Sequence, residues 1–427
     1  MLELTYIPLH IIFIILTNYF PKYFIFKIFK VETNLLSRLV IGISFNIFIF
    51  LLISFFNTNT LEIIRIYLIS IFIINLFFFI KENWNFNTEN LSLIFIFIIT
   101  LSLSVWIANN FQLGWDPQFF WYPKALNFFY GQNISNLVNI NRPEYPYLGS
   151  LIWAIYSKIS LVEYEYFGRI FYIYFYVLSV FFMSEILNQK NIFKIVCALL
   201  LILLSFKFSL ISGYQEILIF SVFAIISKYY YSIINENNLN LNIFILSILL
   251  FSVIWIKNEA ILFALAFVIS LVLSKKFNIN FKVKFSLLFI FFVIIRLSIF
   301  NYYNFEQALQ PGNYNDLKIL NGEFVNFSRI FLILKFFAFG ILDNLMLLAS
   351  ITALSILLII NKKQIFIFYN YSIFLFLCMS IIFIAYLFSS MPLQWHLNVS
   401  MNRLLTEISG YFTILIILFV NQNLKRI

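Results

Sequence analysis

The residues of this sequence that could do chemistry are carboxylates and cations at the ends of apolar segments. Asp116 follows Gly-Trp, Glu216 follows Gly-Tyr-Gln, and Lys257 begins Lys-Asn-Glu-Ala. His396 and Arg403 are seven residues apart, which would place them on one helix face about 10 Å from each other. Carboxylates can accept a proton from a hydroxyl group, and cations can stabilise a departing anion. These residue types therefore suit proton transfer next to an anionic group.

The segment 114–125 has two interpretations. Asp116 followed by proline is typical of a helix start, with Asp116 as the N-cap and the proline at the first helical position. Alternatively, the Asp116 carboxylate lies at a membrane surface among aromatic faces, including those of Trp115 and Trp121. Aromatic faces suit stacking on a sugar ring, and Lys124, two turns along, suits a phosphate. The sequence leaves both interpretations open.

Two further motifs have structural as well as functional explanations. Two prolines within the segment 141–148 predict an extended turn that leads into an apolar helix. Arg142 and Tyr145 of this turn could instead face an anionic ligand. Glu216 could complement the N-terminus of a helix or take part in a site.

The last two motifs are equally ambiguous. Asn258 could cap a helix with Glu259 in its first turn, while the Lys257 side chain extends along the surface. Arg403 could pair locally with Glu407 at i,i+4. Zinc-protease, nucleophile-elbow, phosphate-loop and dinucleotide-binding glycine motifs are all missing from the sequence, which makes metalloprotease, serine hydrolase and nucleotide-binding functions weak candidates.

The composition indicates how these residues are positioned. Of the 427 residues, 63% are hydrophobic and only 11% are charged, whereas soluble domains carry about 25% charged residues. The composition therefore predicts an all-α polytopic membrane protein. Since a crossing needs about 20 apolar residues, we expect about 13 transmembrane helices, within a range of 11 to 14. The expected crossings lie near 6–20, 38–56, 62–80, 91–108, 166–187, 194–212, 215–234, 241–256, 260–274, 284–302, 342–360, 365–387 and 407–421.

The basic residues predict the orientation. The net charge of +10 comes mostly from Lys and Arg in short connections, and their distribution is explained by the preference of cytoplasmic loops for positive charge rather than by nucleic-acid binding. With the N-terminus outside, the lysine clusters fall on the cytoplasmic side. The segments 109–146 and 303–325 and all the motifs above then fall on the outer face. The shorter apolar stretches 147–160 and 326–340 are expected to be juxtamembrane or re-entrant helices at that face.

This organisation divides the chain into five expected parts. Residues 1–108 form an N-terminal four-span part, and residues 109–165 form an outer catalytic loop with juxtamembrane helices. Residues 166–302 form a core transmembrane bundle. Residues 303–341 form a second outer loop with an interfacial helix, and residues 342–427 form the C-terminal spans.

The motifs resemble, in their order along the chain, those of the bacterial branch of the GT-C class of integral-membrane glycosyltransferases. They are W-D-x-x-x-x-W-x-P-K-A, P-E-Y-P-Y-L, G-Y-Q-E, K-N-E-A and W-H-L-x-x-S-x-x-R-L-L. The class includes protein O-mannosyltransferases, the aminoarabinose transferase of lipid A and the Rhizobium galacturonosyltransferases. The resemblance covers roughly residues 110–260 and 392–408. Elsewhere only the hydropathy is similar.

The resemblance implies a GT-C-like fold and transfer of a sugar from a polyprenyl-phosphate donor, with inversion, to a lipid, glycan or protein acceptor. It implies that Asp116 is the catalytic base. Glu216 matches a second acidic residue of the catalytic site, which would position the acceptor or adjust Asp116 electrostatically, although the family more often has Asp here, after G-Y-A. The family's K-N-E-G is K-N-E-A here. The expected location is the bacterial inner membrane, with the site on its periplasmic face.

The same chemistry assigns expected roles to the remaining residues. Cationic side chains would bind the donor phosphate: Lys257 and Arg403 first, then His396 and Lys124. Aromatic and polar side chains would position the substrate: Trp115, Trp121, Arg142, Tyr145 and Glu259. A divalent metal could share the cationic role, but no ligand cluster in the sequence requires one.

Two alternatives remain. A lipid or glycan transporter would also have many spans, but it predicts ionisable residues at the midplane of several spans, whereas Arg65, Lys207 and Arg296 are scattered. An O-antigen polymerase or ligase would depend on arginines in a large outer loop, and the segment 303–325 contains none.

Overall fold

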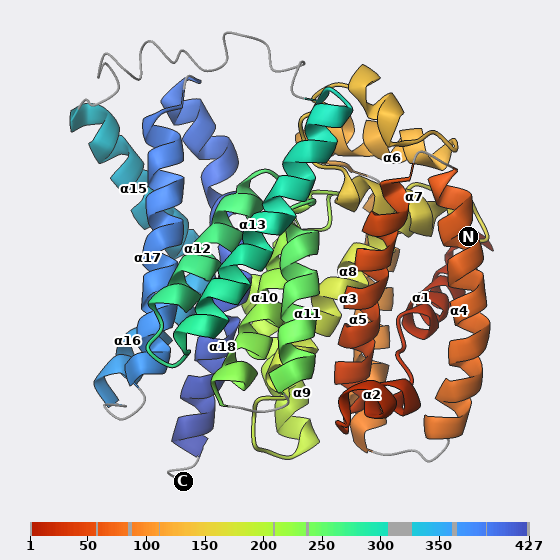
Figure 1. Cartoon of the computed structure of the whole chain (residues 1–427), viewed down its shortest axis with the longest axis horizontal. Helices are drawn as coiled ribbons and strands as arrows, with labels where there is room; N and C mark the ends of the chain where they lie inside the picture. The colour runs from red at the N-terminus through yellow and green to blue at the C-terminus, as the bar shows by residue number, and fades with distance from the viewer. Residues whose placement is uncertain are drawn as a thin grey trace.

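The computed structural model describes residues 2–56, 59–83, 88–110, 112–207, 210–235, 239–305, 327–360, 365–389 and 391–424, and the regular elements in these ranges are all helical (Figure 1). The prediction of an all-helical polytopic membrane protein is confirmed. Much of the segment 303–325 and the cationic residues 362–363 and 425–426 lie outside the described residues. The expectations for these residues therefore remain predictions.

Nine helical segments in the described ranges are long and apolar enough to cross a membrane. The first, Tyr6–Phe29, contains two helices, α1 (Tyr6–Thr17) and α2 (Lys22–Phe29). The other eight are α3 (Leu35–Ser54), α4 (Thr60–Asn83), α5 (Thr88–Asn110), α8 (Tyr166–Ser184), α10 (Glu216–Ile234), α13 (Ile279–Tyr302), α17 (Ile365–Leu387) and α18 (Leu393–Leu424).

Three more expected crossings contain shorter apolar helices, α9 (Asn191–Ser205), α11 (Leu239–Val253) and α12 (Glu259–Leu273). Each has 15 residues, which is about 22 Å of helix against about 30 Å of hydrocarbon. The helices α15 (Phe327–Asp343) and α16 (Leu345–Ile360) meet at 93° and together pass the same length and hydropathy test. Length and hydropathy alone therefore establish fewer crossings than the thirteen expected.

Two helices differ from their expected positions. α7 (Leu148–Ile159) has 12 residues and is too short to cross, as predicted, but residues 148–157 are all buried. It packs between α8 and the short helix α6 (Tyr122–Phe129), which gives this juxtamembrane or re-entrant segment protein neighbours on both sides. α18 begins at Leu393, well before the expected crossing at 407–421, so that His396 and Arg403 lie on the same continuous helix as Glu407.

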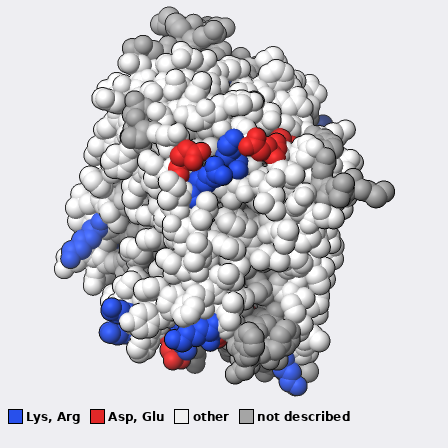
Figure 2. Space-filling model, turned by 90° about the vertical axis from the view of Figure 1, so that its right-hand side faces the viewer, with Lys and Arg blue, Asp and Glu red and all other residues white. Residues whose placement is uncertain are grey.

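The two ends of the bundle differ in the segments that they carry. α2, the start of α9 and the connection between α12 and α13 lie in the lower half of Figure 1, whereas α6 lies at the upper end. These lower segments contain several of the lysines used to predict the orientation. In Figure 2, the charged residues of one face gather in a row across its upper half and along its lower edge; apart from one basic residue at the left edge, the surface between them is largely uncharged. This distribution suits a protein embedded in a membrane.

The centre of the bundle is the contact between α10 and α18. A Cβ atom added at Gly410 of α18 would lie 2.1 Å from the carbonyl oxygen of Phe220 in α10, so the two backbones approach too closely for any larger side chain. α8 covers the same region and is buried along its whole length. This close packing fixes the start of α10 next to the first half of α18.

Candidate functional site

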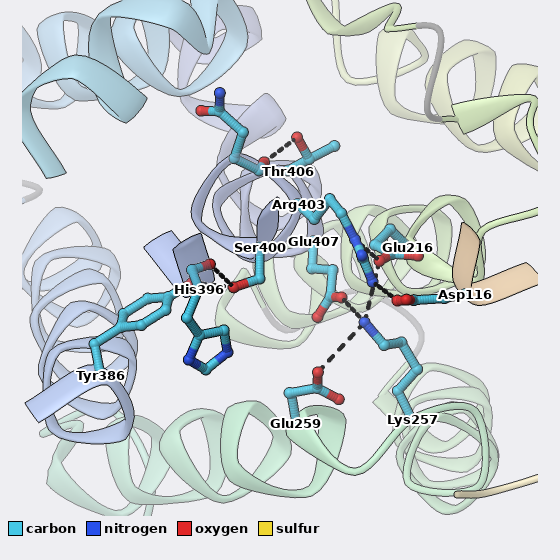
Figure 3. A network of polar contacts seen from close by, with 11 residues as sticks. Asp116, Glu216, Lys257, Glu259, Tyr386, His396, Ser400, Arg403, Thr406 and Glu407 are labelled. Carbon is cyan, nitrogen blue, oxygen red and sulfur yellow. Dashed lines mark hydrogen bonds and ion pairs between the residues drawn. The ribbon is translucent and has the colours of Figure 1, made fainter. Parts of the chain in front are cut away.

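Six charged side chains from four parts of the chain meet at this contact (Figure 3). We call them the ionic network. Its members are Asp116 before the helical turn η2 (Pro117–Trp121), Glu216 at the start of α10, Lys257 between α11 and α12, Glu259 at the start of α12, and Arg403 and Glu407 of α18. The segments carrying Asp116, Glu216, Lys257 and Arg403, which were all expected on one face of the membrane, therefore meet in the structure.

Arg403 joins the two carboxylates that were predicted to be catalytic. Its Nε donates a hydrogen bond to Glu216 Oε1 at 2.6 Å, and its Nη2 donates to Asp116 Oδ2. The guanidinium carbon also lies 4.3 Å from the centre of the Tyr214 ring, a distance at which a cation is attracted by the ring face. A guanidinium can bridge two carboxylates because its five donors form a fixed fork. The partners of Arg403 are thus distant residues, not the local Glu407.

Lys257 is enclosed by three carboxylates. Its Nζ lies 2.7 Å from Glu407 Oε1, 3.2 Å from Glu216 Oε1 and 3.4 Å from Glu259 Oε1. The interpretation that this side chain extends along the surface is wrong, since it is only 5% exposed. Burial would lower the pKa of the ammonium, but the three carboxylates raise it well above its usual value. Lys257 therefore stays positively charged and holds the inner carboxylates in place.

The ionic network contains four carboxyl groups but only two cations. Glu216 Oε1 accepts from both cations, while the second oxygen atoms of Glu216 and Glu407 are buried without a hydrogen-bond partner among the described residues. Burying a carboxylate without compensation is costly, and neighbouring like charges increase that cost. The network therefore has the capacity to hold an additional proton or to attract a cationic group.

The members of the ionic network differ in their access to the surface. Glu407 and Glu216 are almost completely buried, whereas the side chains of Arg403, Asp116 and Glu259 are 14%, 19% and 41% exposed. Asp116, Arg403 and Glu259 are therefore the members that reach the protein surface. Lys257, Glu216 and Glu407 lie behind them and determine their positions.

Asp116 does not act as a helix cap. Its backbone is already helical, and its side chain makes no capping hydrogen bond. The next five residues form a π-helical turn, a wider turn than the α-helical one that is frequent at functional sites. The N-cap interpretation is therefore wrong, and the carboxylate is used in the ion pair with Arg403.

Aromatic residues surround the accessible edge. Trp115 is largely exposed and contacts the rings of Phe119 and Phe120. Trp121 is buried and stacks on Tyr145, with ring centres 5.5 Å apart. Burial, followed by the charge of Glu259, raises the pKa of the Tyr145 phenol to about 12, with a smaller effect from Asp116. Trp115 and Tyr145 thus lie near the site, and Trp121 supports Tyr145.

Lys124 is not part of the ionic network. Its fully buried ammonium donates to the carbonyl oxygen of Arg142 at 2.7 Å and to that of Tyr145. Burial lowers the pKa of this amine to about 7, although Glu144 partly opposes the shift. Arg142 pairs with Glu144 at 3.3 Å and has a left-handed backbone conformation, with φ of 55°. This geometry favours a structural role for Lys124, which ties the turn at 142–145 to α6, over phosphate binding.

His396 lies at the opposite side of the network from Asp116 (Figure 3). Its Nδ1 is 2.8 Å from Ser389 Oγ, and its ring makes an edge contact with Tyr386. Ser400 donates to the His396 carbonyl oxygen and also bonds the Tyr386 hydroxyl. His396 is therefore held at the rim of the site and is half-buried.

Glu407 is the site residue that the sequence did not reveal. It stands in an apolar run, and its i,i+4 spacing from Arg403 favoured a local pair. A carboxylate within a predicted crossing is nevertheless a signal in itself, because such residues rarely face lipid. Asn258 was also misassigned: its side chain does not cap α12 but accepts from Arg296 at 2.5 Å.

Among the described residues, no group of three or more His, Cys, Asp or Glu is arranged to hold a metal ion. Neither known protein families nor curated proteins nor solved structures include one that matches the chain. Inference about function therefore depends on the ionic network and its surroundings.

Proposed function

We propose that the chain is a membrane glycosyltransferase that transfers a sugar from a polyprenyl-phosphate donor to a hydroxyl group of a lipid, glycan or protein. The observation that carries this proposal is the ion pair of Asp116 with Arg403 at an accessible edge, held from behind by Glu216 and Lys257. This edge combines a carboxylate that can accept a proton with a cation that can bind a phosphate. Both are needed when a hydroxyl displaces a lipid phosphate from a sugar.

The proposed reaction is a single displacement. The Asp116 carboxylate takes the proton of the acceptor hydroxyl as its oxygen forms a bond to the anomeric carbon. The bond from that carbon to the phosphate oxygen breaks on the opposite face, and the phosphate leaves as a polyprenyl monophosphate. The configuration at the anomeric carbon is therefore inverted.

The contacts change the cationic roles expected from the sequence. Lys257 is enclosed by carboxylates, so it acts as a positioning residue for Glu216 and Glu407. Arg403 is the cation that can meet a phosphate at the accessible edge, with His396 at the rim. Binding of the phosphate by Arg403 loosens its pair with Asp116 and frees that carboxylate for the hydroxyl proton. Donor binding would thus make the Asp116 carboxylate available as the general base.

The aromatic residues support a sugar as the transferred group. The exposed indole of Trp115 and the Tyr145 ring offer faces of the kind on which sugar rings stack. Glu259 offers an exposed carboxylate for sugar hydroxyls. These residues would position the substrate.

The finer topology belongs to the same proposal. The nine long helical segments, the three 15-residue helices and the bent pair of α15 and α16 would together give thirteen crossings of a GT-C-like fold. With the lysine-bearing connections on the cytoplasmic side, the ionic network would face the outer side of a bacterial inner membrane.

The test uses the full-length protein purified into lipid nanodiscs and supplied with polyprenyl-phosphate sugars that are labelled in the sugar. Chromatography of the lipid products follows the release of polyprenyl monophosphate and the movement of label to added acceptor lipids, glycans or peptides. We expect release that depends on the acceptor. Movement of intact donor between leaflets without any covalent change would instead establish a transporter and would refute the proposal.

A further inference from the structure

A second polar cavity lies far from the ionic network, at the end of the bundle with the lysine-bearing connections. It has a volume of about 530 Å³, which is in the range of pockets that hold small ligands. It lies between the C-terminal ends of α8 and α10 and the N-terminal ends of α3 and α11. Its lining is mainly polar, and none of the lining residues takes part in the proposed sugar transfer.

Lys228 of α10 provides the positive charge of this cavity. Its Nζ donates to the carbonyl oxygen of Phe182 at 2.5 Å and lies 3.5 Å from the centre of the Phe182 ring. No carboxylate in the described part of the chain is within ion-pair distance of it. The nearby Glu185 is already bound by Lys194 at 3.1 Å and by the Asn34 amide at 3.0 Å. Lys228 thus lines the cavity without a carboxylate bonded to it in the described part of the chain.

Two hydroxyl groups of the lining have no partner among the described residues. Tyr229 is 5% exposed, and its hydroxyl makes no hydrogen bond to any residue that the structure describes. The buried hydroxyl of Thr33 also has none. Leaving a buried hydroxyl unpaired costs free energy, so a polar cavity lined by such groups is suited to a ligand that accepts hydrogen bonds.

The N-terminus of α3 completes a set of donors. Asn34 caps this 20-residue helix, and the side chains of Asn34 and Ser37 line the cavity together with that of Ser232. The start of a helix carries partial positive charge and favours anions. Glu32 is the one carboxylate of the described lining; it is largely exposed and lies 3.6 Å from Lys22. The balance of charge therefore favours an anionic ligand.

We propose that this cavity binds the phosphate group of a polar headgroup, with Lys228 as its cationic partner and the Tyr229 and Thr33 hydroxyls as donors. The same phosphate chemistry could come from an anionic phospholipid or from a soluble phosphate ester. The position at the ends of membrane helices favours the lipid. The proposal is independent of sugar transfer, because none of these residues belongs to the ionic network.

The test measures lipid binding to the full-length protein in detergent by native mass spectrometry. Phosphatidylglycerol and phosphatidylcholine are titrated separately, and sn-glycerol 3-phosphate is added as a soluble competitor. We expect the protein to retain phosphatidylglycerol in preference to phosphatidylcholine. Lys228→Met should weaken this binding about 10- to 100-fold, and Tyr229→Phe about 2- to 10-fold.

Matched variants separate the site from general effects. Tyr174→Phe also removes a buried hydroxyl without a partner, but this residue is outside the cavity lining, and Lys335→Met removes an exposed cation on α15. Both should bind phosphatidylglycerol like the parent. If Lys228→Met fails to fold, the comparison of Tyr229→Phe with Tyr174→Phe decides the question.

The competitor identifies the source of the phosphate. Displacement of phosphatidylglycerol by glycerol phosphate at similar concentration would support the site but assign it to soluble esters, whereas failure to displace would support a lipid. Equal retention of the two phospholipids, or equal binding by Tyr229→Phe and Tyr174→Phe, would overturn the proposal. Sugar transfer measured on the same samples would report separately on the ionic network.

Discussion

Lys257 Nζ and Glu407 Oε1 lie 2.7 Å apart in the interior of the protein, although 150 positions separate the two residues in the sequence. Glu407 is completely buried and Lys257 almost so. A buried pair of this kind does little for stability relative to well-packed apolar residues, but each charge becomes expensive when its partner is removed. The pair therefore joins α18 to the connection between α11 and α12.

Lys257→Met should destabilise the protein by about 3–5 kcal/mol, because three carboxylates lose the cation between them. The double variant Lys257→Met/Glu407→Leu should recover part of this loss, since it also removes the innermost carboxylate. Unfolding in mixed detergent micelles measures both, together with Glu407→Leu, as a double-mutant cycle. Simple additivity of the two single effects would show that the pair is not coupled.

Asp116→Asn should reduce sugar transfer by about 10²- to 10⁴-fold, because the amide keeps the shape of the side chain but cannot accept the proton. Folding and donor binding should change little. The measurement compares turnover and donor affinity of purified variant and parent, with Asp343→Asn, an exposed carboxylate at the end of α15, as the matched control. Turnover close to that of the parent would remove Asp116 as the base and favour Glu216.

Arg403→Lys should lower turnover about 10- to 100-fold, which corresponds to about 1.4–2.8 kcal/mol of barrier. A lysine keeps the charge but cannot hold Glu216 and Asp116 simultaneously in the forked geometry of a guanidinium. Steady-state kinetics with varied donor should show a raised KM as well as a lowered kcat, because Arg403 is proposed to bind the donor phosphate. An unchanged donor KM would place the phosphate elsewhere.

The stability of the folded protein should increase with pH between about 7 and 10. The pKa of Lys124 falls to about 7 on burial, so in this window the unfolded chain binds a proton that the folded chain has released. The slope from this residue approaches about 1.4 kcal/mol per pH unit. Lys257 adds no slope there, since its pKa is raised and its contribution is lost only at higher pH.

Unfolding curves at several pH values, recorded for the parent and for Lys124→Met, measure this effect. The variant should lack the part of the slope that Lys124 contributes. Parallel pH profiles for the two proteins would show that Lys124 keeps its proton, held by the carbonyl oxygen atoms of Arg142 and Tyr145.

Gly410→Ala should destabilise the protein by about 1–3 kcal/mol and lower sugar transfer as well. The added methyl group would meet the Phe220 backbone and force α10 and α18 apart. Since α10 carries Glu216 and α18 carries Arg403, the same displacement should disturb their contact. Asn398→Ala, at an exposed position of α18, is the control. A variant with parental stability and activity would show that the two helices can separate freely.

Much of the arrangement follows from hydropathy and charge. The apolar runs predict the helices. The distribution of basic residues predicts that Asp116, Glu216, Lys257 and Arg403 share one face of the membrane, and they do lie together at one end of the bundle. These inferences succeed because burying an apolar helix and excluding charge from lipid are large effects that do not depend on detailed packing.

Hydropathy and charge do not predict which side chains pair with one another. Arg403 has a carboxylate one turn away at Glu407, and only the packing of α10 against α18 directs it to Glu216 instead. Lys124 resembles a surface cation until the turn at 142–145 folds over it. Such choices are decided by tertiary contacts between segments that are distant in the sequence.

The π-helical turn after Asp116 has a consequence for how the protein can change in evolution. Such a turn holds one residue more than an α-helical turn, and each residue of a helix corresponds to a rotation of roughly 100°. Deleting any single residue of Pro117–Trp121 would restore the ordinary spacing and rotate Asp116 away from Arg403, even if every charged residue were retained. If Asp116 acts as proposed, we therefore expect the number of residues in this turn to be constrained as much as their identity. Homologues that lose the extra residue should also have lost the acidic residue before it.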